Sequence, residues 1–275
     1  LTEIPYPVLG NNQTIIKISA VGLCRTDLYV ANGIIPIFKP VVLGHECSGT
    51  IVRTTSVKFK ENQLVSVNPY QDGKFMGVTL NGCLSEFIVV NNEYIVLSKP
   101  NLTCEQTAYV EPVASVMAIL KANLEKDSNG IIYGNNRIAQ LTHTVLNTFG
   151  YKNIKIIGDD DEDSLHDNYY DFIIESQIDE KIFKKLIQIL KPNGLLILKS
   201  RKFTPTEIII NDLVLKDINI KCLSYYNDFD QAMQWILDNS LEVNKLIGKS
   251  FHISDFKEAL SEAVKGESNK IFIHF

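Results

Sequence analysis

The sequence predicts an α/β protein with two closely packed domains, the first rich in β-strands and the second built on a parallel sheet. Roughly the first hundred residues hold short β-type runs between turn residues, such as TIIKISAVGL and VVLGHECSGTIV. From about residue 105 onward the apolar period becomes helical, and strand-helix-strand patterns then alternate. That alternation indicates parallel strands joined by crossover helices.

The elements follow in a regular order along the chain. Expected strands in the first part lie at residues 14–23, 41–52, 62–70, 84–90 and 93–98, and a helix is expected at 105–126. In the second part, strands at 130–134, 153–158, 169–176 and 195–200 alternate with helices at 137–150 and 180–194. A strand at 213–226, a helix at 229–240 and a helix-strand pair at 250–275 complete the expected series.

Composition excludes several functional classes. The chain has 275 residues, which exceeds the usual size of one domain, and a net charge of −5, which provides no basic surface for nucleic acid. No apolar run reaches the roughly 18 residues of a membrane helix, and no leader pattern is recognised, so we expect a cytoplasmic protein without a membrane partner. The five cysteines include no CxxC pair, which argues against disulfides and against a four-cysteine zinc site.

Residues 41–52, VVLGHECSGTIV, interrupt a strand-like run with a histidine, a carboxylate and a thiol. Cys24 precedes this run, and together with His45 and Glu46 it offers the ligand types of zinc. Asp27 is close enough in sequence to orient one of these ligands. A structural interpretation stays open on the residues alone, in which His45 is a hydrogen-bonded core histidine and Cys24 a small buried side chain.

Several motifs in order resemble the zinc-dependent medium-chain dehydrogenase/reductases, the superfamily of alcohol, polyol and threonine dehydrogenases. They are VGLCRTDLYVANG, PVVLGHECSGTIV, VSVNPY, MGVTLNGCLSEFIVV and YVEPVASVMAIL. The resemblance implies a GroES-like catalytic domain at residues 1–118, completed by 249–275. It also implies a reduced Rossmann-type doubly wound nucleotide-binding domain at 119–248.

The same resemblance implies one catalytic zinc site. Cys24 and His45 correspond to zinc ligands, and Glu46 to a carboxylate that is a ligand in some members and a neighbour of the metal in others. Glu111 corresponds to a further ligand in the polyol and threonine branches. Whether Glu46 or Glu111 completes the zinc shell stays open.

Four residues beside the expected metal have implied catalytic or structural roles. Thr26 corresponds to the hydroxyl that hydrogen-bonds the substrate alcohol, and Tyr29 lies where many members have a relay histidine. Structural roles, a helix cap for Thr26 and ordinary core packing for Tyr29, remain alternatives. Gly44 is expected to turn the chain so that His45 reaches the metal, and Cys47 is expected to be a buried core thiol.

The nucleotide fingerprint of this superfamily, Gly-x-Gly-x-x-Gly or Ala, is only partly retained. Gly134 and Ala139 keep its first and last positions, but Asn136 stands at the middle glycine. A β-carbon there crowds a pyrophosphate, although Asn tolerates left-handed backbone better than most residues.

Asp159 ends the next strand, where NAD-dependent members hold the adenosine ribose, and the acidic run at 159–163 would repel a 2′-phosphate. NAD(H) is therefore expected rather than NADP(H). Lys270 and Arg25 correspond to basic residues that reach cofactor phosphate in some members.

The chain is shorter than the superfamily pattern in two places. Only QDGKF stands where members carry a lobe with four cysteines, so no structural zinc is expected. One βαβ unit is missing before YYDFIIES, which removes apolar surface for the adenine. The segment LVLKDINIKCLSYY resembles the strand through which these proteins pair, so a homodimer through the nucleotide domain is expected.

Three functions compete at this stage. The first is a zinc- and NAD-dependent oxidoreductase acting on a secondary alcohol such as a polyol, sugar or amino alcohol. The second is a zinc enzyme of the same fold with lyase, isomerase or hydrolytic chemistry, suggested by Asn136 and the shortened nucleotide domain. The third is a non-catalytic binding protein, which leaves the ligand set unexplained.

Overall fold

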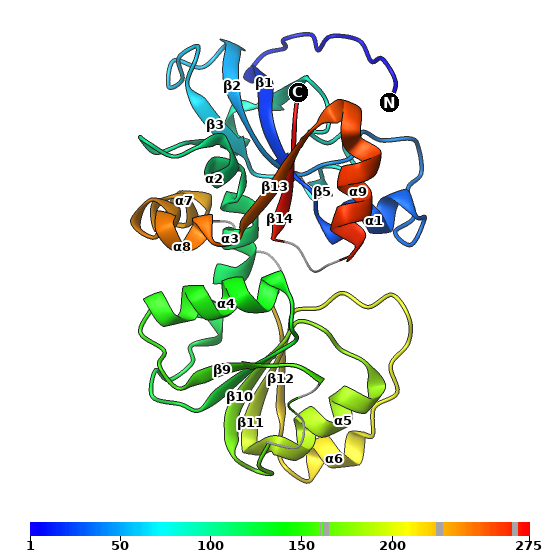
Figure 1. The fold of residues 1–275 in the computed structure, drawn as a ribbon, viewed down its shortest axis with the longest axis vertical. Helices are drawn as coiled ribbons and strands as arrows, with labels where there is room; N and C mark the ends of the chain where they lie inside the picture. The colour runs from blue at the N-terminus through cyan, green and yellow to red at the C-terminus, as the bar shows by residue number, and fades with distance from the viewer. Residues whose placement is uncertain (160, 162–164, 224–227, 266–268) are drawn as a thin grey trace. The chain divides into compact units, whose positions relative to one another are not determined.

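The computed structural model describes residues 1–159, 161, 165–223, 228–265 and 269–275. The chain forms two compact units, drawn in Figure 1. The first comprises Leu1–Ala114 with Asn227–Phe275, and the second comprises Ser115–Tyr226. Helix α3 crosses the boundary between them.

The first unit is mainly β-structure. Its strands are β1 (Gln13–Gly22), β2 (Glu46–Thr54), β3 (Leu64–Val67), β4 (Tyr70–Gln71), β5 (Lys74–Phe75), β6 (Phe87–Asn91), β7 (Ile95–Leu97), β13 (Ile247–His252) and β14 (Lys270–His274). Its helices are α1 (Arg25–Ala31), α2 (Cys104–Ala108), α7 (Phe229–Asp238), α8 (Ser240–Asn244) and α9 (Phe256–Lys265), with α3 (Val110–Met117) starting in this unit. Short 3-10 turns occupy η1 (Asn92–Tyr94) and η4 (Ile253–Asp255).

Strand β1 organises the large sheet of this unit. The sheet runs in the order β13-β14-β1-β2-β3-β7, and β6 also pairs with β1. At the end of β1, Gly22 lies opposite Glu46 of β2 on one side and Phe272 of β14 on the other. The first residue of β2 and the C-terminal strand are therefore brought to the same end of β1.

The apolar side chains of these strands form the core that keeps this register. Ile16, Ile18, Val21 and Leu23 of the β1 region are at most 2% exposed. Cys47 is 1% exposed in the same cluster, which confirms the expectation of a buried core thiol. A slip of one residue would turn this apolar set away from the core, so the register is well specified.

The second unit holds a five-stranded sheet in which every strand pair is parallel. Its strands are β8 (Gly130–Tyr133), β9 (Ile154–Ile157), β10 (Tyr170–Glu175), β11 (Leu190–Leu198) and β12 (Asn219–Cys222). Its helices are α4 (Arg137–Thr148), α5 (Glu180–Ile189) and α6 (Ile210–Val214), preceded by the 3-10 turn η2 (Ala118–Ala122). Figure 1 shows α4 on one face of the sheet and α5 on the other.

The strand order of this sheet is β12-β11-β10-β8-β9. From β8 the chain first adds β9 on one side, then crosses to add β10, β11 and β12 in turn on the other. This is a doubly wound sheet with its reversal point between β8 and β10, where such folds bind ligands at the carboxyl ends of the strands. The described residues between β9 and β10 include no further strand, as the shortened sequence predicts.

The predicted fold class is confirmed: a β-rich domain and a doubly wound parallel sheet. The compact units group residues 227–248 with the β-rich unit, whereas the sequence-based division assigned them to the nucleotide-binding domain. Helix α8 contacts α2 and α7 contacts β7, which accounts for this grouping. Among the described residues, no helix has the length and apolar character to cross a membrane.

A substitution at Gly22 tests the close packing at the end of β1. An added Cβ would lie 2.5 Å from Glu46 Oε2 and 2.7 Å from Lys270 Cε, two side chains that form a buried ion pair beside this glycine. We expect Gly22→Ala to lower the free energy of unfolding by about 1–3 kcal/mol, measured by urea denaturation. Gly158→Ala is the control, because its added Cβ would have only an ordinary 3.5 Å contact. Equal stability of the two variants would contradict the close packing of Glu46 and Lys270 against Gly22.

Candidate metal centre and nucleotide site

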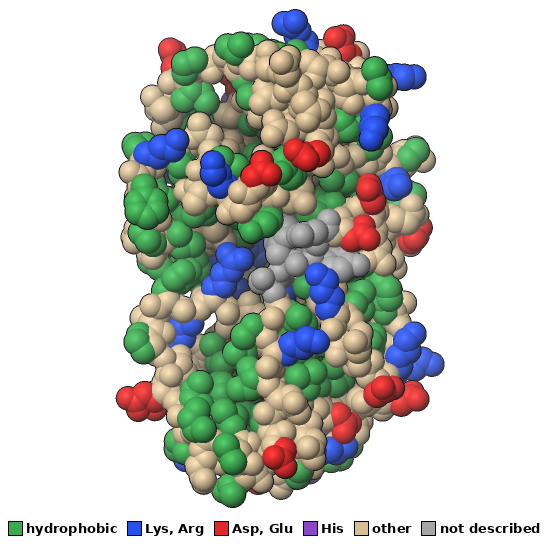
Figure 2. Space-filling view, turned by 180° about the vertical axis from the view of Figure 1, so that it is seen from behind, with side chains coloured by type: hydrophobic (Ala, Val, Ile, Leu, Met, Phe, Trp, Pro, Cys, Tyr) green, Lys and Arg blue, Asp and Glu red, His purple; other side chains and the backbone are tan. Residues whose placement is uncertain are grey.

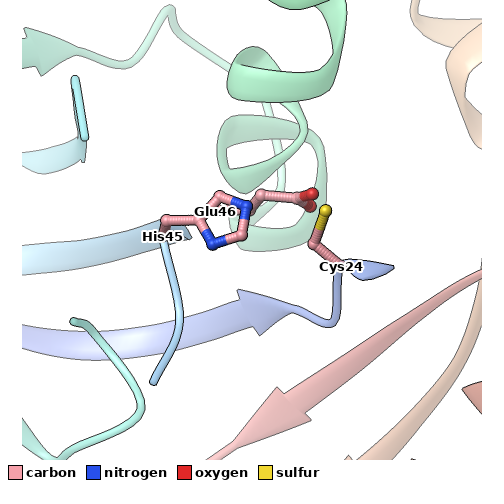
Figure 3. A group of neighbouring side chains, drawn as sticks. All are labelled: Cys24, His45 and Glu46. Carbon is pink, nitrogen blue, oxygen red and sulfur yellow. The ribbon is translucent and has the colours of Figure 1, made fainter. Parts of the chain in front are cut away.

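Three side chains of different chemistry meet in the first unit. The ligand atoms of Cys24, His45 and Glu46 all lie within 4.8 Å of one another. His45 and Glu46 are each 2% exposed, and Cys24 is half-buried. Figure 3 shows the thiol, the imidazole and the carboxylate directed toward a common point.

The local fold explains how distant residues reach this point. Cys24 follows β1 and immediately precedes helix α1, and its backbone is extended. His45 and Glu46 lie where β2 begins beside the end of β1. Gly44 has φ +91°, and a Cβ there would lie 2.9 Å from the backbone nitrogen of Leu84. The turn expected at Gly44 is therefore confirmed, and only glycine fits it without strain.

Asp27 joins the two segments that carry the cluster. Its Oδ2 accepts a hydrogen bond from the backbone N–H of Cys24 at 3.0 Å, and its Oδ1 accepts one from Gly44 at 2.9 Å. The same Oδ1 lies 3.4 Å from His45 Nδ1. One carboxylate thus positions the Cys24 backbone, the turn before His45 and the imidazole ring, which agrees with the orienting role expected for it.

The electrostatic environment of His45 favours positive charge. Burial alone would lower the pKa of the imidazole, but the Asp27 carboxylate and the Cys24 thiol outweigh burial and raise that pKa well above its ordinary value. Burial alone would raise the pKa of Asp27, but His45 and the N–H groups of Cys24 and Gly44 bring it below its ordinary value. Metal binding requires a neutral imidazole, so a bound cation would replace the proton that the site otherwise stabilises.

The donor set fits a zinc ion. A thiolate, an imidazole and a carboxylate are all zinc ligands, and three protein ligands with one open position are typical of catalytic zinc sites. The His45 ring also packs against Phe75, with the ring centroids 5.1 Å apart and the rings tilted by 53°. Cys24, His45 and Glu46 are the residues of this unit that would hold the metal.

Glu46 has a second partner that the sequence does not reveal. Lys270 of β14 forms a buried ion pair with its Oε2, and the two side chains are 6% and 2% exposed. Lys270 was expected to reach a cofactor phosphate. Its ammonium instead lies in the interior of the first unit, where it balances the Glu46 charge.

The remaining expected residues of this unit lie around the cluster. Thr26 is 9% exposed, with its Oγ1 3.8 Å from Cys24 Sγ. Tyr29 is half-buried on α1, and Arg25 is exposed at the first position of that helix. Glu111 is 8% exposed in the first turn of α3, and among the described residues it lies outside the group of ligand atoms within 4.8 Å. The carboxylate that the structure groups with Cys24 and His45 is Glu46.

In the second unit, Gly134 and Asn136 lie at the reversal point of the parallel sheet. Gly134 has φ +121°, and a Cβ there would lie 2.4 Å from Ser176 Oγ at the end of β10. Asn136 is the N-cap of α4: its Oδ1 accepts hydrogen bonds from the N–H groups of Ile138 at 3.0 Å and Ala139 at 3.1 Å. Its φ of −141° is extended, so the left-handed backbone considered for this position is not adopted.

This cap occupies the donors that a pyrophosphate would use. Helix N-terminal N–H groups bind phosphate in doubly wound folds, and here the amide of Asn136 already satisfies two of them. The Asn136 amide nitrogen also donates to Ser176 Oγ at 2.9 Å, which fixes the side chain across the end of β8. The turn at Gly134 therefore fits a dinucleotide. The Asn136 side chain, however, would have to rotate away before phosphates could accept hydrogen bonds from the N–H groups at the start of α4.

Asp159 follows β9 and is exposed, and one of its carboxylate oxygens accepts a hydrogen bond from the hydroxyl of Tyr133. Tyr133 is 1% exposed and ends β8, so it anchors Asp159 beside the reversal point. Residues 160 and 162–164 of the acidic run lie outside the described residues. The sequence alone did not identify Tyr133 or Ser176, because neither belongs to a motif and their partners are 26 and 40 residues away in the chain.

Comparison with known proteins gives a consistent result. The model of the alcohol dehydrogenase GroES-like domain matches residues 10–101. Sorbitol dehydrogenase of Bombyx mori is 23% identical over 333 aligned positions, covering 100% of this chain and 94% of that protein. Sorbitol dehydrogenase of Bacillus subtilis is 26% identical over 175 residues, covering 54% of this chain and only 50% of that protein.

The Bombyx mori alignment is longer than the 275 residues of this chain, so the chain lacks segments that the relative has, as the sequence predicts. Among solved structures, 2R,3R-butanediol dehydrogenase from Bacillus subtilis superposes with a TM-score of 0.89 at 23% identity, covering 100% of this chain and 95% of that one. Its low identity supports the fold alone. Taken together, these findings show that residues 10–101 form an alcohol dehydrogenase GroES-like domain and that the whole chain is similar to sorbitol dehydrogenase in sequence and to butanediol dehydrogenase in fold.

Proposed function

We propose that this protein is a zinc-dependent oxidoreductase that transfers hydride between NAD and a secondary alcohol of the polyol, sugar or amino-alcohol class. The observation that carries the proposal is the convergence of Cys24, His45 and Glu46 around one point, held by Asp27. The curated relatives that share this fold include sorbitol dehydrogenases and D-xylulose reductase, which supports the substrate class. A cytoplasmic location is part of the proposal.

In this proposal Cys24, His45 and Glu46 hold one catalytic zinc. Glu111 of α3 is the alternative carboxylate ligand. The metal, when bound, supplies a positive charge that lowers the pKa of a substrate hydroxyl. The hydroxyl of Thr26, 3.8 Å from Cys24 Sγ, would accept a hydrogen bond from the substrate hydroxyl and take its proton while releasing its own. Tyr29, one turn along α1, passes the proton outward. Asp27 keeps the imidazole oriented throughout.

The hydride requires a cofactor, because no protein side chain accepts one. Gly134 and Ala139 form the turn and the helix start that receive a pyrophosphate, and Asp159 is placed for a ribose hydroxyl. The carboxylate of Asp159 favours NAD over NADP, since a 2′-phosphate beside it would be repelled. Arg25, exposed on α1, remains available to a phosphate, whereas the charge of Lys270 is already paired with Glu46.

A second candidate function rests on a specific observation at α4. Asn136 occupies two N–H donors of the helix, so the chain as it stands would bind a dinucleotide weakly. A zinc enzyme with lyase, isomerase or hydrolytic chemistry uses the same metal centre without this cofactor. A non-catalytic binding role would require neither metal nor cofactor, and it leaves the buried ligand cluster without a purpose.

The chain also has the features of a protein that pairs through its parallel sheet. Strand β12 is the edge of that sheet, and Ile220 in it is 40% exposed. Helix α6, which precedes it in the chain, exposes Ile210 and Val214, and Leu215 follows at the helix end; these three side chains are 63–74% exposed. Figure 2 shows hydrophobic side chains gathered in patches between scattered charged ones on the face it draws. An unpaired edge strand with apolar neighbours is a site for pairing with a second copy, and we propose a homodimer there.

Metal analysis tests the cluster directly. We expect the purified protein to retain about one tightly bound zinc per chain, measured by mass spectrometry of the metal after dialysis. Cys24→Ser and His45→Ala should each remove most of it, because each deletes one of three ligands. Cys222→Ser, which changes an exposed cysteine far from the cluster in sequence, should keep it. Protein without zinc, prepared without chelators, would rule out the proposed metal centre.

Replacement of the α4 cap tests the cofactor. Asn136→Gly should tighten NADH binding by about tenfold, measured by NADH fluorescence titration, because it frees the Ile138 and Ala139 N–H groups for phosphate. The cost in stability should be only a few tenths of a kcal/mol. Asp179→Gly removes the equivalent cap of α5, where Asp179 Oδ1 accepts from Ile182, and should leave NADH binding unchanged. If neither protein binds NADH or NADPH, the non-redox candidate takes precedence.

A charge on the edge strand tests the dimer. Ile220→Lys should convert a dimer to a monomer, because it places a solvated cation on the strand that would pair, with the mass measured by light scattering after gel filtration. Val264→Lys changes a residue of α9 that is 63% exposed and should leave the mass unchanged. A wild-type protein that is already monomeric at micromolar concentration would contradict the proposal.

A further inference from the structure

A second group of metal-ligating side chains lies in the first unit, apart from the Cys24 cluster. The ligand atoms of Cys104, Glu105 and His274 lie within 4.8 Å of one another. His274 Nε2 is 3.1 Å from Glu105 Oε1, and Cys104 Sγ donates to Glu105 Oε2 at 3.3 Å. The carboxylate thus stands between a thiol and an imidazole.

The fold fixes the three residues from two sides. Cys104 and Glu105 open helix α2, whose first turn is held by reciprocal hydrogen bonds between Thr103 and Gln106, at 2.9 and 3.2 Å. The carbonyl of Cys104 also accepts a hydrogen bond from Ser48 Oγ of β2 at 2.7 Å. His274 is the last residue of β14. Helix α2 therefore fixes the positions of Cys104 and Glu105, and strand β14 of the main sheet fixes that of His274.

The three ligand atoms are close enough together to hold one small cation. Zinc binds nitrogen and oxygen at about 2.0–2.1 Å and thiolate sulfur at about 2.3 Å, so neighbouring ligands of a tetrahedron lie about 3.3–3.6 Å apart. His274 Nε2 and Cys104 Sγ lie 3.1 and 3.3 Å from the two different oxygens of Glu105, so an ion held by either oxygen would need only a small shift of the other side chain. A thiolate and a carboxylate also balance the two positive charges of the ion.

A simple ion pair between His274 and Glu105 explains only two of the three residues. The Cys104 thiol contributes little to such a pair, because an S–H group is only a weak hydrogen-bond donor to the Glu105 carboxylate. As a metal ligand the thiol has a defined role. The side chains of His274 and Glu105 are 29% and 22% exposed, which leaves the fourth position of a tetrahedron open to water and the metal able to exchange.

We propose that Cys104, Glu105 and His274 form a second, exchangeable site for a thiophilic divalent transition metal such as Zn²⁺. Thiolate with imidazole favours zinc and cobalt over magnesium and calcium, which prefer oxygen ligands. The bound ion connects helix α2 to the C-terminal strand β14. Because β14 also carries Lys270, the partner of Glu46, the ion stabilises the strand that supports the first cluster.

Cobalt titration tests this site independently of the proposed catalytic one. In a Cys24→Ser background, which removes the only thiol of the first cluster, we expect one equivalent of Co²⁺ to produce a near-ultraviolet band of cobalt-thiolate charge transfer. Adding Cys104→Ser should abolish the band, and adding His274→Ala should weaken cobalt binding at least tenfold. Adding Cys222→Ser, at an exposed cysteine of the second unit, should change neither.

The outcomes separate the two sites. A band that survives Cys104→Ser, or a Cys24→Ser protein without any cobalt-thiolate band, overturns the second site whatever the catalytic metal does. If Cys24→Ser does not fold, the same titration in the otherwise unchanged protein should lose one of two cobalt equivalents on Cys104→Ser. Added Zn²⁺ should also raise the melting temperature of the Cys24→Ser protein but not of Cys24→Ser/Cys104→Ser.

Discussion

The buried carboxylate of Asp27 is the constraint on which the first cluster depends. It accepts hydrogen bonds from the backbones of Cys24 and Gly44 and lies against the ring of His45. It thereby connects two segments that are separated by twenty residues of chain. Its low pKa keeps it charged, so it both positions the imidazole and balances whatever positive charge the site holds.

A second constraint acts through the register of β1. Gly22 leaves the space in which Glu46 and Lys270 meet from the strands on either side. A buried ion pair is stable only when both charges are present, because removing either leaves the other desolvated. Glu46 therefore serves two partners: the lysine fixes its carboxylate on one side, and the cluster with Cys24 and His45 lies on the other. This arrangement makes the C-terminal strand part of the proposed metal centre.

The sequence predicted the parts of the site that are contained in local motifs. The residue types of Cys24, His45 and Glu46 suggested a metal site, and the resemblance of the ordered motifs to the superfamily assigned them as ligands and Cys47 as a core residue. The turn at Gly44 was expected from the same run. The roles of Lys270 and Asn136 were not predicted. The role of Lys270 depends on which strands lie beside β1, since β14 brings it to Glu46. The role of Asn136 depends on its side chain, which caps its own helix and so occupies the N–H groups that a ligand would use. Residue spacing in the sequence predicts neither the Lys270–Glu46 ion pair nor the Asn136 cap.

The shortened second unit shows why a fold class is easier to predict than a cofactor. Loss of one βαβ unit leaves the order of the remaining strands intact, because β8 and β9, and likewise β10 and β11, are still joined by the crossover helices α4 and α5. The reversal point between β8 and β10 therefore survives, with Gly134 still in the backbone conformation that the turn needs. The proposed cofactor affinity depends instead on a few N–H donors at the start of α4. A pyrophosphate bound there would have to compete with the Asn136 amide for the N–H groups of Ile138 and Ala139, so this one side chain would decide the affinity.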